Sequence, residues 1–164
     1  MKNYSNVMRK HGKTFFWASW FLDGELASLV FAVYAFCRRL DDLVDNNANK
    51  KNLHNLIFLS DLMKKNKYYG AFEEFKGFDK KSLPREIIVS EFLKGQVSDL
   101  NYKQPKNIDQ LLVYCYQVAG SVGLMVCDVI GIKNKELKYY AIDLGIAMQL
   151  TNICRDIMED AELG

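Results

Sequence analysis

The chain has 164 residues, of which 49% are hydrophobic and 26% charged, and its formal net charge is +2. This composition is ordinary for a globular protein, and the length is within the usual range for one domain. So small a net charge gives no basis for general binding of nucleic acid. We therefore expect one globular domain over residues 1–164, without a nucleic-acid partner.

The sequence has only weak signals for insertion into a membrane. The N-terminal stretch MKNYSNVMRKHGK has no apolar region of the kind found in signal peptides. The most apolar stretches, Leu26–Cys37 and Val118–Ile132, are shorter than the roughly 18 residues of a spanning helix, and Asp128 interrupts the second. We expect a cytoplasmic protein, with peripheral association at a membrane left open.

Apolar residues recur at three- and four-residue spacing, and no strand-like alternation is sustained, which predicts an all-α fold. In chain order, Asp23 is a suitable N-cap for a helix running to about Asp45. The Asn- and Lys-rich segment 46–52 is expected to interrupt the helices. Two middle helices are then predicted over Leu53–Lys65 and Tyr68–Phe78.

The second half of the chain contains further helix signals. Pro84 fits the first turn of a helix that ends near Asn101. Asn107 and Asn134 are suitable N-caps for two later helices. These helices are expected over 107–130 and 134–162.

Several side chains are expected to be structural. The four cysteines lack metal-binding spacing and have apolar neighbours, which predicts buried, reduced thiols. They are Cys37, Cys115, Cys127 and Cys154. The aromatic residues are expected mostly in the core, with some facing a ligand: Phe15, Phe16, Trp17, Phe31 and Phe36. Gly120 and Gly123 are expected to permit close helix packing or a kink, because no strand precedes them and no Gly-Lys-Ser/Thr follows.

Two of the predicted helices each carry a polar face with two carboxylates one turn apart. Spacings of 4, 3 and 4 residues place on the first face Tyr34, Arg38, Asp41 and Asp45. Spacings of 3, 4 and 4 residues place on the last helix Gln149, Asn152, Asp156 and Asp160. A solvated acidic surface is the simple explanation, since like charges one turn apart cost only about a few tenths of a kcal/mol. The strongly apolar residues around both faces favour a ligand site instead.

If the two faces meet, their oxygen atoms suit Mg²⁺, which is commonly bound by a few carboxylates together with substrate phosphates. Arginine and lysine side chains would neutralise the remaining phosphate charge. A diphosphate held in this way becomes a good leaving group.

Five segments of the sequence resemble segments of a known protein family. VYAFCRRLDDLVD and LGIAMQLTNICRDIMEDAELG resemble the two aspartate-rich motifs of squalene, dehydrosqualene and phytoene synthases. YCYQVAGSVGLM is similar to the central helix of that family, EFLKGQVSDL to the helix before it, and KHGKTFFWA to an N-terminal segment that contacts diphosphate. The resemblance implies an all-α isoprenoid synthase class I helical bundle. It also implies C-terminal truncation, since members of the family continue into further helices.

The resemblance also assigns roles to individual residues. The Mg²⁺ ligands would be Asp41, Asp45, Asn152, Asp156 and Asp160. The diphosphate groups would be held by His11, Lys13, Thr14, Arg38 and Arg155. The reacting carbons would lie near Tyr34, Tyr114 and Gln149. The four aspartates and Tyr114 would be catalytic, although Tyr114 is equally compatible with a core position. Asp42 and Glu159 point away from the ligand faces and are expected to have a supporting role at most.

The activity implied is the head-to-head condensation of two farnesyl or geranylgeranyl diphosphates through a cyclopropylcarbinyl diphosphate. The product would be phytoene, dehydrosqualene or squalene, and NADPH would be needed only for squalene. Hydrolysis to a prenyl alcohol and a non-catalytic helical module remain alternatives. Besides the substrates, the expected partners are a second copy of the chain or a separate C-terminal part.

Overall fold

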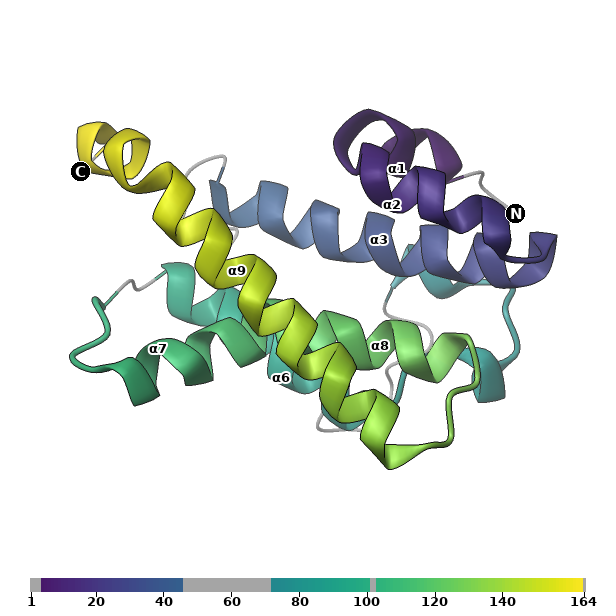
Figure 1. Ribbon diagram of the computed structural model, residues 1–164. Coiled ribbons are helices and arrows are strands. Elements are labelled where there is room, and N and C mark those ends of the chain that lie inside the picture. The colour runs from purple at the N-terminus through teal and green to yellow at the C-terminus, as the bar shows by residue number, and fades with distance from the viewer. Residues whose placement is uncertain (1–3, 46–71, 101–102, 164) are drawn as a thin grey trace.

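The computed structural model describes residues 4–45, 72–100 and 103–163, and the elements in these ranges are helices and turns, as predicted. Figure 1 shows α3, below α1 and α2 in the view, lying over α6, α7 and α8, with α9 crossing the front of the bundle. Both α3 and α9 run from right to left in this view, so their C-terminal ends lie at the same end of the molecule.

The N-terminal segment forms a small helical layer that the sequence did not predict. It consists of α1 (Ser5–His11), α2 (Lys13–Ala18) and the 3-10 turn η1 (Ser19–Phe21). This layer lies along one side of α3 (Figure 1). The buried side chain of Met8 fixes α1 to the body of the protein.

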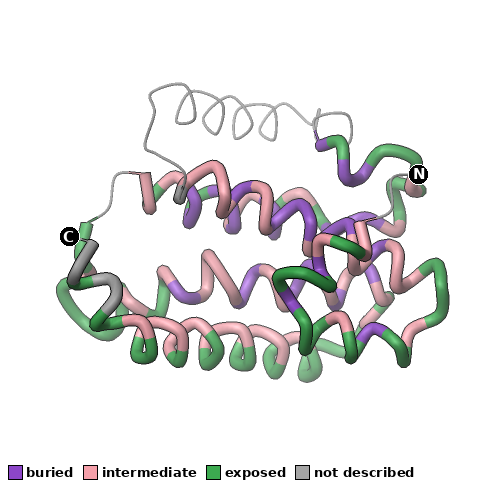
Figure 2. Tube along the Cα trace, turned by 90° about the horizontal axis from the view of Figure 1, so that it is seen from above, coloured by how far each residue is buried: buried purple, intermediate pink, exposed green. Residues whose placement is uncertain are grey.

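Helix α3 (Gly24–Asp45) begins as predicted, because the Asp23 carboxylate accepts a hydrogen bond from the Leu26 N–H at 2.9 Å. Its buried residues recur at helical spacing, which turns one apolar side of the helix toward the core. The ring of Phe36 lies at the centre of an aromatic cluster, 4.7 Å from the ring of Phe72 and 5.9 Å from that of Phe92. Figure 2 shows the buried residues on the inner sides of the helices.

The prediction of an α-helix over Tyr68–Phe78 is wrong for the part that the structure describes. Residues 72–78 contain only a 3-10 turn, η2 (Glu73–Phe75), followed by a left-handed Gly77 with φ of 91°. The segment is held by tertiary contacts: Phe72 and Phe75 pack on Phe36, and the buried Glu74 carboxylate pairs with Arg39. These contacts override the local helix preference. The other middle helix, predicted over Leu53–Lys65, lies outside the described residues.

A second short 3-10 turn, η3 (Lys80–Ser82), leads to α6 (Glu86–Leu100). Pro84 lies two residues before α6 rather than in its first turn. The next helical run comprises α7 (Ile108–Cys115), a π-helical segment η4 (Tyr116–Gly120) and α8 (Ser121–Val129). Its N-cap is Asn107, as predicted, because the Asn107 side chain accepts a hydrogen bond from the Gln110 N–H at 2.9 Å.

The run Ile108–Val129 has 22 residues and is the one helix among the described residues that is long and apolar enough to cross a membrane. The apolar stretch Val118–Ile132, expected to be too short to span a membrane, therefore belongs mostly to a longer helical run. Core helices of soluble proteins can have the same length and composition. This run packs against α6 and α9 within the bundle.

Helix α9 (Lys135–Leu163) is capped by Asn134, whose side chain accepts from the Glu136 N–H at 2.8 Å. It lies close against α8 and η4 because glycines occupy the contact. A Cβ at Gly123 would lie 2.4 Å from the carbonyl oxygen of Ala141, and one at Gly145 would lie 2.5 Å from that of Ala119. The prediction that Gly123 permits close helix packing is therefore confirmed.

Three of the four cysteines are buried, as predicted, and all four are free: Cys37, Cys115, Cys127 and Cys154. Burial raises the pKa of the Cys37 thiol well above its ordinary value, which keeps it protonated. The prediction was wrong for Cys154, which is exposed on α9. Of the aromatic residues expected mostly in the core, Phe36 is buried, Phe16 and Phe31 are half-buried, and Phe15 and Trp17 are exposed in α2.

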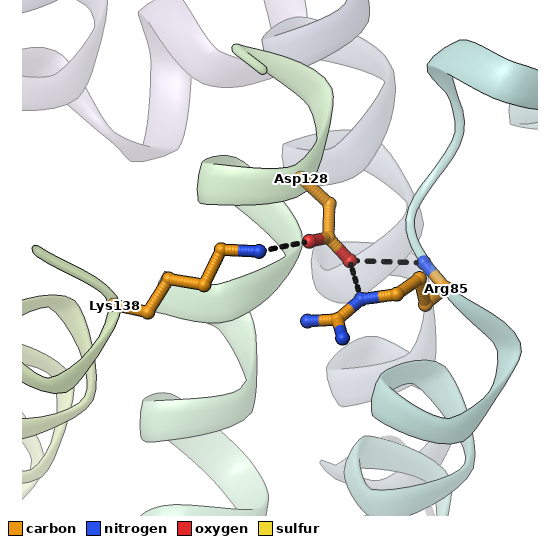
Figure 3. A network of polar contacts seen from close by, with 3 residues as sticks. All are labelled: Arg85, Asp128 and Lys138. Carbon is orange, nitrogen blue, oxygen red and sulfur yellow. Dashed lines mark hydrogen bonds and ion pairs between the residues drawn. The ribbon is translucent and has the colours of Figure 1, made fainter. Parts of the chain in front are cut away.

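Asp128, near the end of α8, joins the beginnings of two other helices (Figure 3). One carboxylate oxygen accepts hydrogen bonds from the Arg85 backbone N–H at 3.1 Å and from its Nε at 2.9 Å. The other accepts from the Lys138 Nζ at 3.1 Å. Burial by itself would raise the pKa of Asp128, but the hydrogen bonds from Arg85 and Lys138 outweigh it and lower the pKa below its ordinary value.

Candidate functional site

The polar face of α3 brings together three of the predicted site residues, Tyr34, Arg38 and Asp41. Burial raises the pKa of the Tyr34 hydroxyl above its ordinary value of 10.0. The charge of Arg38 opposes this shift, whereas the Asp41 carboxylate adds to it. Tyr34 therefore stays protonated at neutral pH and offers a hydroxyl donor between a cation and an anion.

The KHGKT segment lies against this face of α3. The ring of Tyr34 covers Gly12 so closely that a Cβ at Gly12 would lie 2.8 Å from the Tyr34 hydroxyl oxygen. The Phe15 ring lies 6.4 Å from the Tyr34 ring, centroid to centroid. The three predicted diphosphate contacts in this segment are exposed: His11, Lys13 and Thr14. Residues separated by about 20 positions in the sequence thus meet at one place.

The guanidinium group of Arg38 has one nitrogen in an ion pair and another that is unpaired within the described part of the chain. Its Nη2 forms an ion pair with the Asp42 carboxylate at 2.6 Å, one turn further along α3. Its Nε is buried and has no hydrogen-bond partner among the residues that the structure describes. An unpartnered buried donor costs about 1–3 kcal/mol, which an anionic ligand would recover. Asp42, expected to have a supporting role at most, is paired with Arg38 and orients it.

Sequence reasoning missed Gln96, on α6. This side chain is 3% exposed, and its amide donates a hydrogen bond of 2.9 Å to the Asp41 carboxylate. Its carbonyl oxygen is buried without a partner in the described part of the chain. The signal was present, because Gln96 continues the buried positions Val89 and Phe92 of α6 at helical spacing. A polar residue at a core position calls for a polar partner.

On α9, Gln149 and Asn152 are half-buried, as expected for residues that face inward. Arg155 and Asp156 form a two-bond ion pair, with Nε–Oδ1 and Nη2–Oδ2 distances of 2.6 and 2.7 Å. The hydrogen bonds from Arg155 lower the pKa of the Asp156 carboxyl. The structure therefore pairs a residue predicted to bind diphosphate with a residue predicted to bind Mg²⁺.

The remaining predicted residues are placed less fully. Tyr114 is half-buried near the end of α7. The side chains of Asp45, Glu159 and Asp160 lie outside the described residues. Within the described part of the chain, no three histidine, cysteine, aspartate or glutamate side chains converge on a metal position.

The donor set nevertheless fits a magnesium ion in its chemistry. Helix α3 is continuous from Asp41 to Asp45, and α9 is continuous from Asn152 to Asp160. Each helix therefore carries residues with carboxylate or amide groups at successive turns of its backbone, and these helix ends lie at the same end of the molecule (Figure 1).

Comparison with known proteins shows the family of the chain. A family model described as squalene/phytoene synthase matches residues 8–164. The 15-cis-phytoene synthase of Enterobacter agglomerans is 31% identical over 96% of this chain and 58% of its own length. The chloroplastic phytoene synthase of Narcissus pseudonarcissus is 36% identical over 96% of this chain and 40% of its own.

A solved structure gives the same result for the fold. The crystal structure of a dehydrosqualene synthase in complex with ligand superposes with a TM-score of 0.80 at 36% sequence identity. The match covers 98% of this chain and 58% of that protein. The chain thus spans about half the length of the relatives it matches. The family match over nearly all of its residues, together with the shared helical fold, shows that this chain belongs to the squalene/phytoene synthase family.

Proposed function

We propose that the chain binds prenyl diphosphates with Mg²⁺ and takes part in the head-to-head condensation of two farnesyl or geranylgeranyl diphosphates. The observation that carries the proposal is the cluster around Tyr34, in which the buried free Nε of Arg38 lies on the same helix face as Asp41. An anion-binding donor beside a carboxylate suits a metal diphosphate. The names of the phytoene and dehydrosqualene synthase relatives support this substrate class.

The Mg²⁺ ligands in this proposal are Asp41, Asp45, Asn152, Asp156 and Asp160. Bound Mg²⁺ would supply positive charge to the departing diphosphate. Arg155 is held by Asp156 in the free protein. We propose that Arg155 turns to a substrate phosphate when Asp156 binds the cation, so that two new ionic contacts replace one.

The residues of the N-terminal segment and α3 would orient the substrate. Arg38 and Lys13 would neutralise the diphosphate, and the protonated Tyr34 hydroxyl would donate a hydrogen bond to it. The rings of Phe15 and Tyr34 would shield the allylic cation from water.

The proposed reaction has two steps, and one diphosphate leaves in each. Loss of diphosphate from one substrate gives an allylic cation, which the double bond of the other attacks, and one proton is lost as the cyclopropane closes. The second diphosphate then leaves. Loss of another proton gives phytoene or dehydrosqualene, whereas hydride from NADPH gives squalene.

The experiment that tests this function is incubation of the protein with farnesyl or geranylgeranyl diphosphate, with and without Mg²⁺, and mass spectrometry of organic extracts. The Asp41→Asn and Asp156→Asn variants are assayed beside it. A metal-dependent C30 or C40 hydrocarbon that both variants fail to produce is the expected result.

Other outcomes identify the alternatives. A prenyl alcohol without hydrocarbon would indicate a hydrolase, and substrate binding without turnover would indicate a non-catalytic helical module or the need for a partner that completes the fold. Fractionation of cells would test the proposed cytoplasmic location.

A further inference from the structure

An aromatic patch lies on the N-terminal layer, made by Trp17 at the end of α2 and by Trp20 and Phe21 in η1. These side chains are 58%, 71% and 79% exposed, respectively. They are nevertheless ordered against their neighbours, since the Trp17 and Phe21 rings meet edge to face at 5.5 Å and the Trp20 ring lies 6.5 Å from that of Phe16. Large aromatic side chains grouped in this way on a surface mark an interaction site.

The same layer is rich in positive charge. Residues 1–22 contain four lysines and arginines and no carboxylate, whereas the whole chain carries only +2, which leaves a net −2 on the other 142 residues. Three of these basic residues, Arg9, Lys10 and Lys13, are exposed on α1 and α2. The layer lies at the outer edge of the molecule, beside α3 (Figure 1).

We propose that this N-terminal layer docks on the surface of a bilayer that contains anionic lipid. Tryptophan and phenylalanine insert at the boundary between headgroups and acyl chains, while lysine and arginine bind the anionic headgroups. The composition favours lipid over a protein partner, because lysine is depleted in protein interfaces whereas basic and aromatic residues together are typical of membrane-surface segments.

Docking in this orientation connects the membrane to the candidate site. Phe15 lies next to the patch in α2, and its ring lies 6.4 Å from that of Tyr34. If the proposed function holds, prenyl tails enter the site from the lipid phase through this side of α3. The docking itself does not depend on that function, and it is measured without turnover.

The test uses the protein's own fluorescence, because the chain has two tryptophans and both are in the patch. Emission and co-sedimentation are measured with vesicles of phosphatidylcholine alone and with vesicles that also contain phosphatidylglycerol. We expect a blue shift and co-sedimentation with the anionic vesicles, both of which weaken as salt is raised.

Variants assign the binding to the patch. We expect the Trp17→Ala/Trp20→Ala/Phe21→Ala variant to partition onto the anionic vesicles at least about tenfold more weakly than the unmodified protein, as measured by co-sedimentation. Reversal of charge in Arg9→Glu/Lys10→Glu should weaken partitioning by a similar factor, since each basic residue near an anionic surface contributes about 1 kcal/mol. Circular dichroism confirms that each variant is folded.

The matched control removes exposed apolar side chains elsewhere, in Ile87→Ala/Leu144→Ala, and should bind as the unmodified protein does. Unchanged emission and no co-sedimentation with anionic vesicles would overturn the proposal. The proposal would also be overturned if binding survives in the Trp17→Ala/Trp20→Ala/Phe21→Ala variant but is lost in the Ile87→Ala/Leu144→Ala control. Emission that shifts with protein concentration in the absence of lipid would assign the patch to a contact between copies, which also overturns it.

Discussion

Asp41 is the residue at which the packing of the core and the chemistry of the site meet. It belongs to the polar face of α3, and its carboxylate accepts a hydrogen bond from the buried Gln96 of α6. A hydrogen bond from an amide fixes the carboxylate without neutralising its charge, as is useful for a metal ligand. The adjacent Arg38 is oriented in the same manner by Asp42.

We predict that Gln96→Leu changes function more than stability. The lost hydrogen bond to a charged group is worth about 1.5–3 kcal/mol, but the change also removes a buried carbonyl oxygen that has no partner among the described residues, so the two effects largely cancel. Loss of a group that orients a metal ligand typically weakens metal affinity about 10- to 100-fold. The measurement is the Mg²⁺ concentration for half-maximal substrate binding, beside urea unfolding.

The exposed Gln104→Leu serves as the control for that experiment and should leave the Mg²⁺ dependence unchanged. A large loss of stability in Gln96→Leu with unaltered Mg²⁺ dependence would show that Gln96 is only a packing residue.

The polar face of α3 could be predicted from the sequence, because a helical period fixes which side chains of one helix lie together. The Gln96–Asp41 contact could not, since it joins residues 55 positions apart and depends on how α6 packs. The Arg155–Asp156 pair was also missed. Neighbouring residues on a helix diverge by about 100°, but the long arginine side chain spans that angle.

At the scale of elements, the close contact between α9 and the α7–α8 run depends on glycine. We predict that Gly145→Ala destabilises the fold by about 1–3 kcal/mol, because the new methyl group would meet the backbone of Ala119 and Gly120 and force the helices apart. This loss exceeds the gain in helix propensity, which is about 1 kcal/mol. Urea unfolding provides the measurement.

The matched substitution is Gly24→Ala in the first turn of α3, where a Cβ would meet nothing within 4 Å. It should leave stability unchanged or raise it by up to about 1 kcal/mol. Equal effects at the two positions would mean that the α8–α9 contact is not tightly packed.

The Asp128 cluster joins α8 to the starts of α6 and α9. The Asp128 side chain is 7% exposed, so Asp128→Asn removes charge from a mostly buried acceptor and should cost about 1–3 kcal/mol, with the lower part of that range favoured by the exposure of Arg85. The exposed Asp143→Asn on α9 is the control, and its unfolding free energy should stay within about 0.5 kcal/mol of that of the unmodified protein.

The same carboxylate gives a pH dependence. Its pKa is lowered in the folded state, so the unfolded chain binds the proton first as pH falls below the ordinary value of 3.8. The stability contributed by Asp128 is therefore present above that value and is lost as pH falls through the folded pKa. Unfolding free energies measured across this range should fall less steeply for Asp128→Asn, and parallel curves would contradict the assignment.

The long helices could be predicted well, including α6, which follows Pro84, whereas the short elements could not. Asp23, Asn107 and Asn134 each accept the expected backbone hydrogen bond, and the helices that follow them begin where the sequence indicates. The segment 72–78 has no such local signal, since its conformation is set by the insertion of Phe72 and Phe75 beside Phe36. The N-terminal layer was missed because its helices are short and mostly exposed.

At the scale of the whole molecule, the two acidic faces lie apart from the aromatic patch of the N-terminal layer. The carboxylates of the two polar faces belong to helices about 100 residues apart in the sequence, whose ends lie at the same end of the bundle (Figure 1). The exposed aromatic patch of Trp17, Trp20 and Phe21 lies on the N-terminal layer instead, together with exposed basic residues of α1 and α2. Under the proposed function, this arrangement suits substrates that have a charged head and an apolar tail.

The central claim is that α3 and α9 contribute to one Mg²⁺-dependent diphosphate site. It is tested most directly by calorimetric titration with farnesyl thiodiphosphate, an unreactive analogue, with and without Mg²⁺. The proteins compared are the unmodified chain, Asp41→Asn, Asp156→Asn, and the exposed controls Glu25→Gln on α3 and Asp143→Asn on α9. The account predicts that Mg²⁺ strengthens binding, and that either site variant, but neither control, loses about tenfold or more of that gain. Binding that ignores Mg²⁺, or that is lost on one helix and unaffected on the other, would contradict it.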